Sequence, residues 1–219
     1  MAAESNKKPE PKSDEKVVQE TELDHVKDML RQYGPSIAAG LILAGVIFLA
    51  LTFHRHRQAS ARMEASQLFM QAQTAEQLQT VVDEYPDTAT APMALLALAS
   101  ARFHDGAVDL AEMHYREFLE RYSDHEMRPS AELGLAYVDE ARGAFAEALE
   151  GFRSFRDIHG DHYLSGPARL GEARVLAQLN RYEEARALYD AILDDPENPW
   201  RAQARSDLMY MEKDLRARE

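Results

Sequence analysis

Histidines and clustered carboxylates are the residues of this sequence whose types and spacing could do chemistry. The densest group is the run His159-Gly160-Asp161-His162, with Asp157 two residues before it. Imidazole and carboxylate groups are the ligands that zinc and related metals bind, but no matching pair precedes the run at the spacing of a zinc site. Glycine and aspartate are also ordinary turn residues. We therefore predict a linker between helices and no metal, and keep a metal-dependent membrane-bound hydrolase as the alternative.

Two carboxylate pairs could be considered for acid–base catalysis, Glu183-Glu184 and Asp194-Asp195. Adjacent residues on a helix do not face each other, and no nucleophile or glycine-rich phosphate loop accompanies them. The sequence has no cysteine, which excludes disulfides, thiol catalysis and cysteine metal sites. We predict a protein that is not an enzyme and binds no cofactor.

The charge of the chain is strongly acidic, with a formal net value of −13. Residues 58–219 alone carry 17 Lys and Arg against 30 Asp and Glu. Such a domain repels phosphate backbones. Nucleic acid is therefore excluded as an expected partner.

Residues 36–53 form an apolar stretch without a charged side chain. A helix of this length is ~27 Å long, close to the ~30 Å hydrocarbon core of a bilayer. Gly34 and Pro35 are expected to end any helix that precedes it, and the basic residues 54–57 suit a headgroup region. A buried core helix is one alternative, and a signal peptide cleaved near residues 59–61 is another. We predict an uncleaved membrane anchor.

The chain before this stretch divides into two parts. Residues 1–20 are rich in Lys, Glu, Pro and Ser and predict a disordered tail. Residues 21–34 place Leu23, Val26, Leu30 and Tyr33 at helical spacing behind a sequence that resembles a capping box. This pattern predicts a short amphipathic helix.

The rest of the chain repeats with a period of 37 residues, which places Ala111, Ala148 and Ala185 in register. Weaker matches occur one period earlier. The other columns are Leu96/Leu133/Leu170, Ala99/Ala136/Ala173, Ala101/Val138/Val175, Gly106/Gly143/Asn180, Val108/Phe145/Tyr182, Tyr115/Phe152/Tyr189, Phe118/Phe155/Ile192 and the acidic Asp124/Asp161/Glu197.

Each period predicts a pair of helices with a break at the glycine column. Small residues, such as Ala99 and Ala111, would lie where the two helices cross, and the aromatic columns would fill the space toward the next hairpin. Such hairpins cannot bury their apolar faces alone, so they stack into a solenoid. We predict an all-α domain over residues 58–219, with repeats at about 58–90, 91–127, 128–164 and 165–197 and a capping helix at 199–218.

The first of these repeats is degenerate. Counting back one period places residues 59–62 in a first helix, which predicts that the apolar helix continues through residues 54–57. Met63, Ala65 and Phe69 would then belong to the first hairpin.

The runs GAVDLAEMHYREFL, GAFAEALEGFRSF and NRYEEARALYDAIL resemble the second halves of tetratricopeptide repeats. The period is 37 rather than the usual 34, and the first helices lack the usual aromatic residues. The positions concerned hold Leu95, Glu132 and Arg169 in one column, and Arg102, Asp139 and Leu176 in the other. The resemblance implies a solenoid of helix hairpins that binds other proteins.

A tail, one span and divergent repeats with junctions such as DEYPDTATAP also resemble the ancillary Sec-translocon subunit (YfgM-like) family. This resemblance implies a single-pass protein of the bacterial inner membrane with a periplasmic repeat domain. It implies the Sec translocon and periplasmic chaperones as partners.

The first helices of a hairpin solenoid line its concave face, so side chains on their inner columns are candidates for contacting a partner. Two of them have an alternative interpretation, because Phe103 and Tyr137 could belong to the core between repeats. A basic, asparagine-rich clamp for a C-terminal carboxylate is not evident in these columns. The candidate protein-binding residues are Ser100, Phe103, Tyr137, Glu140 and Arg174.

The orientation in the membrane is not decided by charge. Cytoplasmic flanks favour positive residues, and the two flanks are tied. The resemblance favours a cytoplasmic N-terminus and a periplasmic repeat domain, and a scaffold or receptor that faces the cytoplasm is the alternative. The tied residues are Lys16, Lys27 and Arg31 before the stretch, and Arg55, Arg57 and Arg62 after it.

Overall fold

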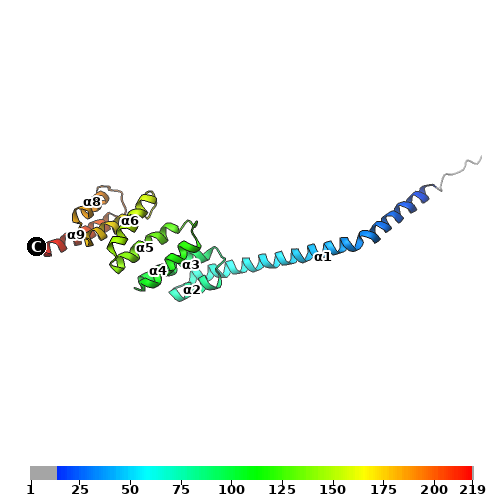
Figure 1. The fold of residues 1–219 in the computed structure, drawn as a ribbon, viewed down its shortest axis with the longest axis horizontal. Helices are drawn as coiled ribbons and strands as arrows, with labels where there is room; N and C mark the ends of the chain where they lie inside the picture. Colours follow the sequence, from blue (N-terminus) through cyan, green and yellow to red (C-terminus); the bar gives the residue numbers. More distant parts are fainter. Residues whose placement is uncertain (1–13, 219) are drawn as a thin grey trace, which may run out of the picture. The chain divides into compact units, whose positions relative to one another are not determined.

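The computed structural model describes the backbone of residues 14–218, and the side chains of Arg31, Gln32 and residues 39–218. Over these residues the chain consists of α-helices joined by short turns and linkers, and it contains no strand (Figure 1). The chain divides between Gln58 and Ala59 into two units, which are described separately. The helices are α1 (Asp14–Gln71), α2 (Ala75–Glu84), α3 (Thr90–His104), α4 (Val108–Arg121), α5 (Arg128–Arg142), α6 (Phe145–Ile158), α7 (Ser165–Gln178), α8 (Tyr182–Leu193) and α9 (Arg201–Arg218).

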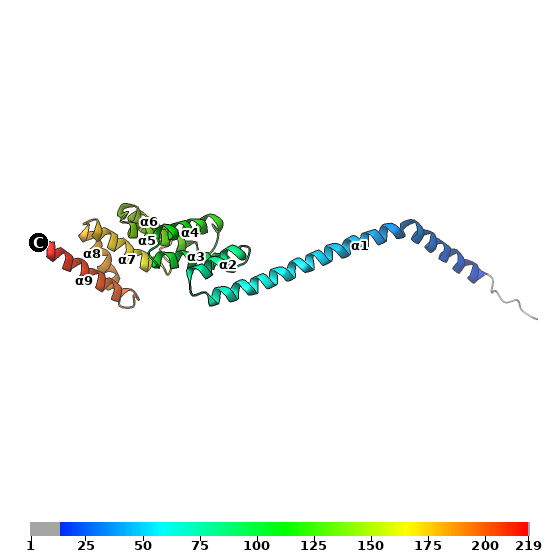
Figure 2. The same ribbon diagram turned by 90° about the horizontal axis from the view of Figure 1, so that it is seen from below.

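The second unit is a stack of helix hairpins. The pairs α3–α4, α5–α6 and α7–α8 are antiparallel neighbours that follow one another along the domain, and each second helix packs on the first helix of the next pair (Figure 2). Helix α9 packs on α8 and α7, where it covers the end of the stack. The predicted all-α solenoid is confirmed.

The turns inside the hairpins are set by one column of the repeat. Gly106 and Gly143 both have φ of 76°, and Asn180 at the same position has φ of 60°. This left-handed backbone is easy for glycine and tolerated by asparagine, and it reverses the chain directly after the first helix. The break predicted at this column is confirmed.

The core of each hairpin rests on small residues. Ala99, Ala111 and their equivalents in the following repeats are buried, which lets the two helices of a pair approach closely. The aromatic column of Tyr115, Phe152 and Tyr189 is also buried. Tyr115 and Phe152 pack toward the next hairpin, and Tyr189 belongs to the core cluster that includes Ala204 and Met211 of α9. The sequence prediction of both layers is confirmed.

Two glycines outside the predicted columns contact two of these aromatic rings. A Cβ atom on Gly134 would lie 2.4 Å from the ring of Tyr115, and one on Gly171 would lie 2.4 Å from the ring of Phe152. Both glycines lie in the first helix of the next pair and are themselves 37 residues apart. A ring seated on a bare backbone therefore joins successive hairpins.

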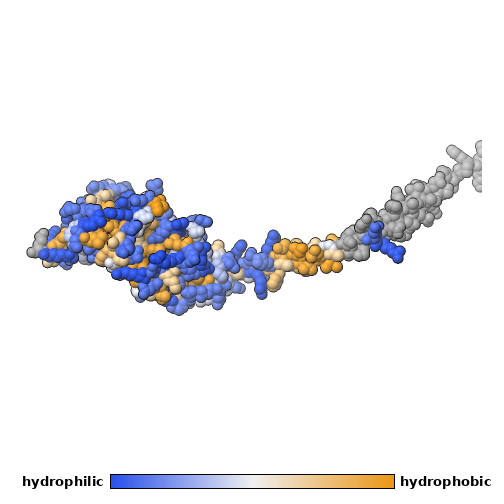
Figure 3. All heavy atoms as spheres, in the orientation of Figure 1, coloured by the Kyte–Doolittle hydropathy of each residue, from blue (hydrophilic) through white to orange (hydrophobic). Residues whose placement is uncertain are grey.

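The first unit contains the apolar part of α1. The helix from Ala39 to Gln71 includes the one described stretch that is long and apolar enough to cross a membrane by length and composition. Its large hydrophobic side chains between Leu41 and Phe53 are 50–69% exposed, and Figure 3 shows them gathered on α1. None of the residues whose side chains are described covers them.

The prediction that Gly34 and Pro35 end a helix is wrong, because α1 is continuous through both residues. A proline inside a helix removes one hydrogen bond and commonly bends the helix without ending it. The predicted tail also ends earlier, since α1 begins at Asp14; residues 14–20 contain no glycine or proline and include helix formers such as Glu15 and Lys16. Residues 1–13 of the predicted tail lie outside the described residues.

The last turns of α1 belong to the second unit. Ala65 is buried, Phe69 is half-buried against the same core, and Glu64 accepts a hydrogen bond of 3.2 Å from the Tyr85 hydroxyl of the segment after α2. Met63 lies on the same turns of α1 but is 66% exposed. Two residues correspond to about 200° of helix rotation, so Met63 points away from the face that buries Ala65.

Candidate functional site

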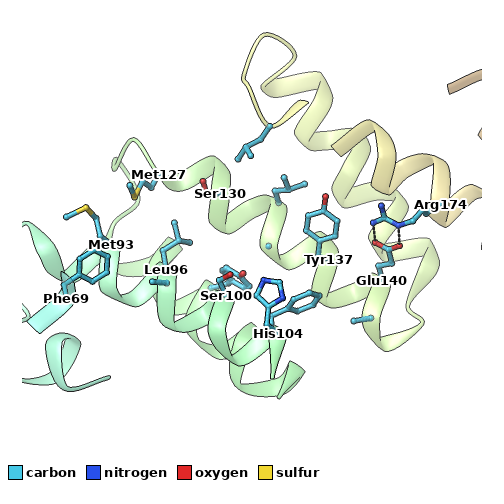
Figure 4. Close-up of a pocket in the computed structure, with 17 residues that line it drawn as sticks. Phe69, Met93, Leu96, Ser100, His104, Met127, Ser130, Tyr137, Glu140 and Arg174 are labelled. Carbon is cyan, nitrogen blue, oxygen red and sulfur yellow. Dashed lines mark hydrogen bonds and ion pairs between the residues drawn. The ribbon is translucent and has the colours of Figure 1, made fainter. Parts of the chain in front are cut away.

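A groove with a volume of about 1050 Å³ runs across the first helices of the hairpins (Figure 4). Its lining comes mainly from α3 and α5, with contributions from the end of α1, from α4 and from α7. The groove lies entirely within the second unit. Repeated hairpins produce such a surface because every first helix presents its inner columns to the same side.

The structure brings all five predicted binding residues to this groove. Ser100 and Phe103 line it from α3, Tyr137 and Glu140 from α5, and Arg174 from α7. Each of the five side chains is half-buried. Phe103 and Tyr137 also pack against core residues, so the core interpretation and the groove interpretation both describe their contacts.

The walls of the groove are apolar, and several of their residues were not singled out from the sequence. Phe69, Met93 and Leu96 lie toward its α1 and α3 side, while Met127 and Leu164 come from the linkers before α5 and α7. The two linker residues are 37 positions apart and apolar in both repeats, which is the signal that could have identified them.

The floor of the groove is the ring of Tyr115 on Gly134. Burial raises the pKa of Tyr115, and its hydrogen bond with Ser100 acts in the opposite direction. The phenol is therefore neutral at ordinary pH.

A polar bridge crosses the groove at its α7 end. Arg174 donates two hydrogen bonds of 2.8 Å to the carboxylate of Glu140, drawn as dashed lines in Figure 4. Its guanidinium lies 5.8 Å from the ring centre of Tyr137, and the Tyr137 hydroxyl donates a hydrogen bond of 3.1 Å to the carbonyl of Pro167. Burial raises the pKa of Tyr137, which keeps this hydroxyl a donor. The bridge joins α5 to α7.

A second, polar pocket of about 550 Å³ lies beyond the bridge, between α7, α8 and α9. Glu140 and Arg174 line both the groove and this pocket. The pocket adds the carboxylates of Asp207 and Asp214 and the guanidinium of Arg218. The same inner face of the stack is therefore apolar over the early repeats and charged over the late ones.

The histidine-rich run considered for metal binding is the linker between α6 and α7. Nε2 of His159 lies 2.8 Å from Oε2 of Glu132, and Nδ1 of His162 accepts a hydrogen bond of 3.2 Å from the amide of Leu164. Both imidazole rings pack on Phe155. Among the residues whose side chains are described, no three His, Asp or Glu residues are grouped to hold a metal ion.

The preceding linker repeats this arrangement. Nδ1 of His125 accepts a hydrogen bond of 3.1 Å from the amide of Met127, and its ring packs on Phe118. His125 and His162 are 37 residues apart. These histidines cap the turn that leads into the next hairpin, which explains their presence structurally.

The groove is suited to burying the apolar side chains of a ligand. Its two formally charged residues, Glu140 and Arg174, bind each other, and the remaining surface is apolar apart from Ser100, Ser130, His104 and the tyrosine hydroxyls. Such a surface stabilises apolar side chains removed from water.

The helix-hairpin repeats of this chain are similar to those of known proteins. The profile of the family described as "Tetratricopeptide repeat-like domain" matches residues 27–204. No curated protein matches the chain. Among solved structures, a tetratricopeptide repeat protein from Parabacteroides merdae is similar, with a TM-score of 0.52 and 17% sequence identity. The similarity covers 72% of this chain and 60% of that protein's chain, and at this identity it concerns the fold alone.

Proposed function

Because the chain belongs to the family of tetratricopeptide repeat-like domains, we propose that it is a non-catalytic adaptor that binds other proteins through the groove of its second unit. One observation carries this proposal: the groove is about 1050 Å³ in volume and apolar, and it lies on the inner columns of the repeats. Pockets of this size and character bury apolar groups of a ligand.

The expected ligand is a segment of another protein. Helices that line a groove on both sides accept an amphipathic helix or an extended stretch, and the apolar face of that segment fills the groove. The residues expected to contact it are Ser100, Phe103, Tyr137, Glu140 and Arg174, together with the apolar walls.

The apolar part of α1 is proposed to anchor the protein in a membrane by one span. Support comes from its length and composition and from the 50–69% exposure of its large hydrophobic side chains. Exposed apolar surface of this extent is unfavourable in water and favourable in a bilayer.

The location of the repeats is proposed to be the periplasmic side of a bacterial inner membrane, with the Sec translocon or periplasmic chaperones as partners. This part rests on the resemblance to the ancillary Sec-translocon subunit family. A reporter fused to the C-terminus, active in one compartment only, tests it. Activity confined to the cytoplasm would replace this proposal with that of a cytoplasm-facing scaffold.

The groove itself is tested by photocrosslinking in native membranes. A photoreactive residue at His104 or Ala141, both exposed and both in the groove lining, should form adducts with a defined partner protein. The same residue at Ser154, exposed on the outer helix α6, is the control.

A groove-filling variant makes this test specific. Ser130→Trp narrows the groove and should remove the adducts formed at His104 and Ala141, whereas Ser154→Trp should leave them unchanged. Equal adducts at groove and control positions, or adducts that survive Ser130→Trp, would contradict the proposal.

A further inference from the structure

The boundary between the apolar groove and the polar pocket has an excess of negative charge. Oδ2 of Asp214 forms an ion pair with Nη2 of Arg218 at 2.6 Å, and the carboxylate of Glu140 accepts two hydrogen bonds from Arg174. Asp207 is the third carboxylate of the pocket. Three carboxylates thus lie at this boundary with only two guanidinium groups to neutralise them.

Asp207 is the one of these three carboxylates that accepts no hydrogen bond from a cationic side chain. Its Oδ1 accepts a hydrogen bond of 2.7 Å from Gln203, whereas its Oδ2 is buried and has no hydrogen-bond partner among the described residues. The nearest cation is Nη1 of Arg174 at 3.9 Å, too far for a hydrogen bond. The side chain is only 11% exposed, so water gives it little stabilisation.

The position of this carboxylate links it to the groove. Arg174 and Glu140 form the end wall of the groove and also line the pocket that contains Asp207. A segment whose apolar side chains fill the groove would bring the residue at its α7 end to this boundary. A cationic group there would meet two carboxylates, Glu140 and Asp207, that share one guanidinium.

We propose that the groove recognises a protein segment with an apolar run flanked by a lysine or arginine, whose cationic group binds Asp207 and Glu140. The inference rests on the proposed function of the groove and adds the charge of its partner. Charge complementarity at the boundary supports it, and so does the wider charge of the domain, because residues 58–219 carry 17 Lys and Arg against 30 Asp and Glu. An acidic residue at the same place would meet the net negative charge of Glu140, Asp207 and Arg174.

The test uses the full chain in nanodiscs of zwitterionic lipid, with empty nanodiscs as the blank. The probes are short fluorescein-labelled helical peptides that share one leucine-rich apolar run and differ in the flanking residue, which is Lys, Gln or Glu at both ends. Fluorescence anisotropy should show the Lys peptide binding about tenfold tighter than the Gln peptide, with the Glu peptide weakest. This ranking requires no variant of the protein.

Two variants then locate the effect. Asp207→Asn should remove most of the advantage of the Lys peptide and leave the affinity for the Gln peptide unchanged. Asp190→Asn, on the exposed surface of α8, is the matched control and should change neither affinity. If Asp207→Asn lowers the helical content, Glu140→Gln and a salt titration replace it, because the advantage of the Lys peptide should shrink as salt rises.

The outcomes separate the two proposals. Equal affinities for all three peptides, or a Lys advantage that survives Asp207→Asn, Glu140→Gln and high salt, would overturn the charge inference and leave the groove as a binding site. If none of the peptides binds, the proposed function of the groove fails first.

Discussion

The contact between α4 and α5 and the contact between α6 and α7 use the same positions of the repeat. In the first, the ring of Tyr115 rests on Gly134; in the second, the ring of Phe152 rests on Gly171. Both rings are buried, and both glycines belong to the first helix of the following hairpin. The apolar packing of the two junctions is therefore nearly the same.

The ion pairs of the two junctions differ in burial. At α4–α5, Arg142 pairs with Glu112, whose side chain is 22% exposed. At α6–α7, Glu172 is 3% exposed and accepts hydrogen bonds of 2.9 Å from Arg153 and 2.8 Å from Arg156. The second junction therefore contains a charge that depends on its partners much more strongly than the first.

The inner faces beside the two junctions differ as well. Tyr137 and Glu140 link α5 to α7, through Pro167 and Arg174. One repeat earlier, Ser100 and Phe103 occupy the positions of Tyr137 and Glu140, and there the groove is open between α3 and α5. The outer columns therefore determine the fold. The inner columns vary from repeat to repeat and determine where the stack leaves an open apolar surface.

The largest expected effect separates the two ion pairs. Glu172→Gln removes the buried carboxylate that Arg153 and Arg156 share, and leaves them only longer ion pairs, with Glu184 at 3.6 Å and with Asp157 at 3.9 Å. It should lower the free energy of unfolding by about 3 kcal/mol, the lower end of the range for breaking a buried ion pair, because both arginines are also partly exposed to water. Glu112→Gln should cost about 1 kcal/mol or less. Urea unfolding of the full chain in micelles, followed by circular dichroism, measures both. Equal losses would show that the burial difference has no energetic consequence.

The glycine pair tests the shared part of the two junctions. Gly171→Ala forces the Phe152 ring to move within a closed core and should cost about 2 kcal/mol. Gly134→Ala should cost about 1 kcal/mol, because the Tyr115 ring can move into the open groove. The same unfolding measurement applies. Gly134→Ala should also weaken binding in the groove, and a larger loss for Gly134→Ala than for Gly171→Ala would contradict the difference in openness.

The inner link between α5 and α7 is tested at Tyr137. Tyr137→Phe keeps the ring and removes the hydrogen bond to the Pro167 carbonyl. The free energy of unfolding should therefore fall by about 1 kcal/mol. Tyr163→Phe, in the exposed linker between α6 and α7, is the matched control and should change little. No difference between the two variants would mean that the link does not stabilise this junction.

The sequence predicted the fold because the fold depends on repeated columns. The alanine, aromatic and turn columns, such as Ala111, Tyr115 and Gly106, impose helix crossing, stacking and reversal wherever they occur, so period and residue type together were sufficient. The column of Gly134 and Gly171 was missed, because glycine inside a helix reads as a weak helix former until the ring that covers it is known.

The candidate site could be predicted in part. The five predicted residues meet in one groove because a column of the repeat fixes the face of each first helix. Which of them bind each other could not be derived, since the bidentate pair of Glu140 and Arg174 depends on side-chain conformations and on the spacing of α5 and α7. The capping role of His125 and His162 was hidden for the same reason.

The smallest expected effect concerns pH and the α4–α5 junction. Hydrogen bonds from Arg116, and then from Arg142, hold the pKa of Glu112 below its ordinary value of 4.5. The ionised carboxylate is thus favoured in the folded state, and its stabilisation is complete above about pH 4.5 and is lost as the pH falls through the lower folded value. The difference in unfolding free energy between the wild-type chain and Glu112→Gln should therefore be constant near neutrality and shrink in acid. A difference that is the same at pH 7 and at pH 3 would show that ionisation of Glu112 does not stabilise this junction.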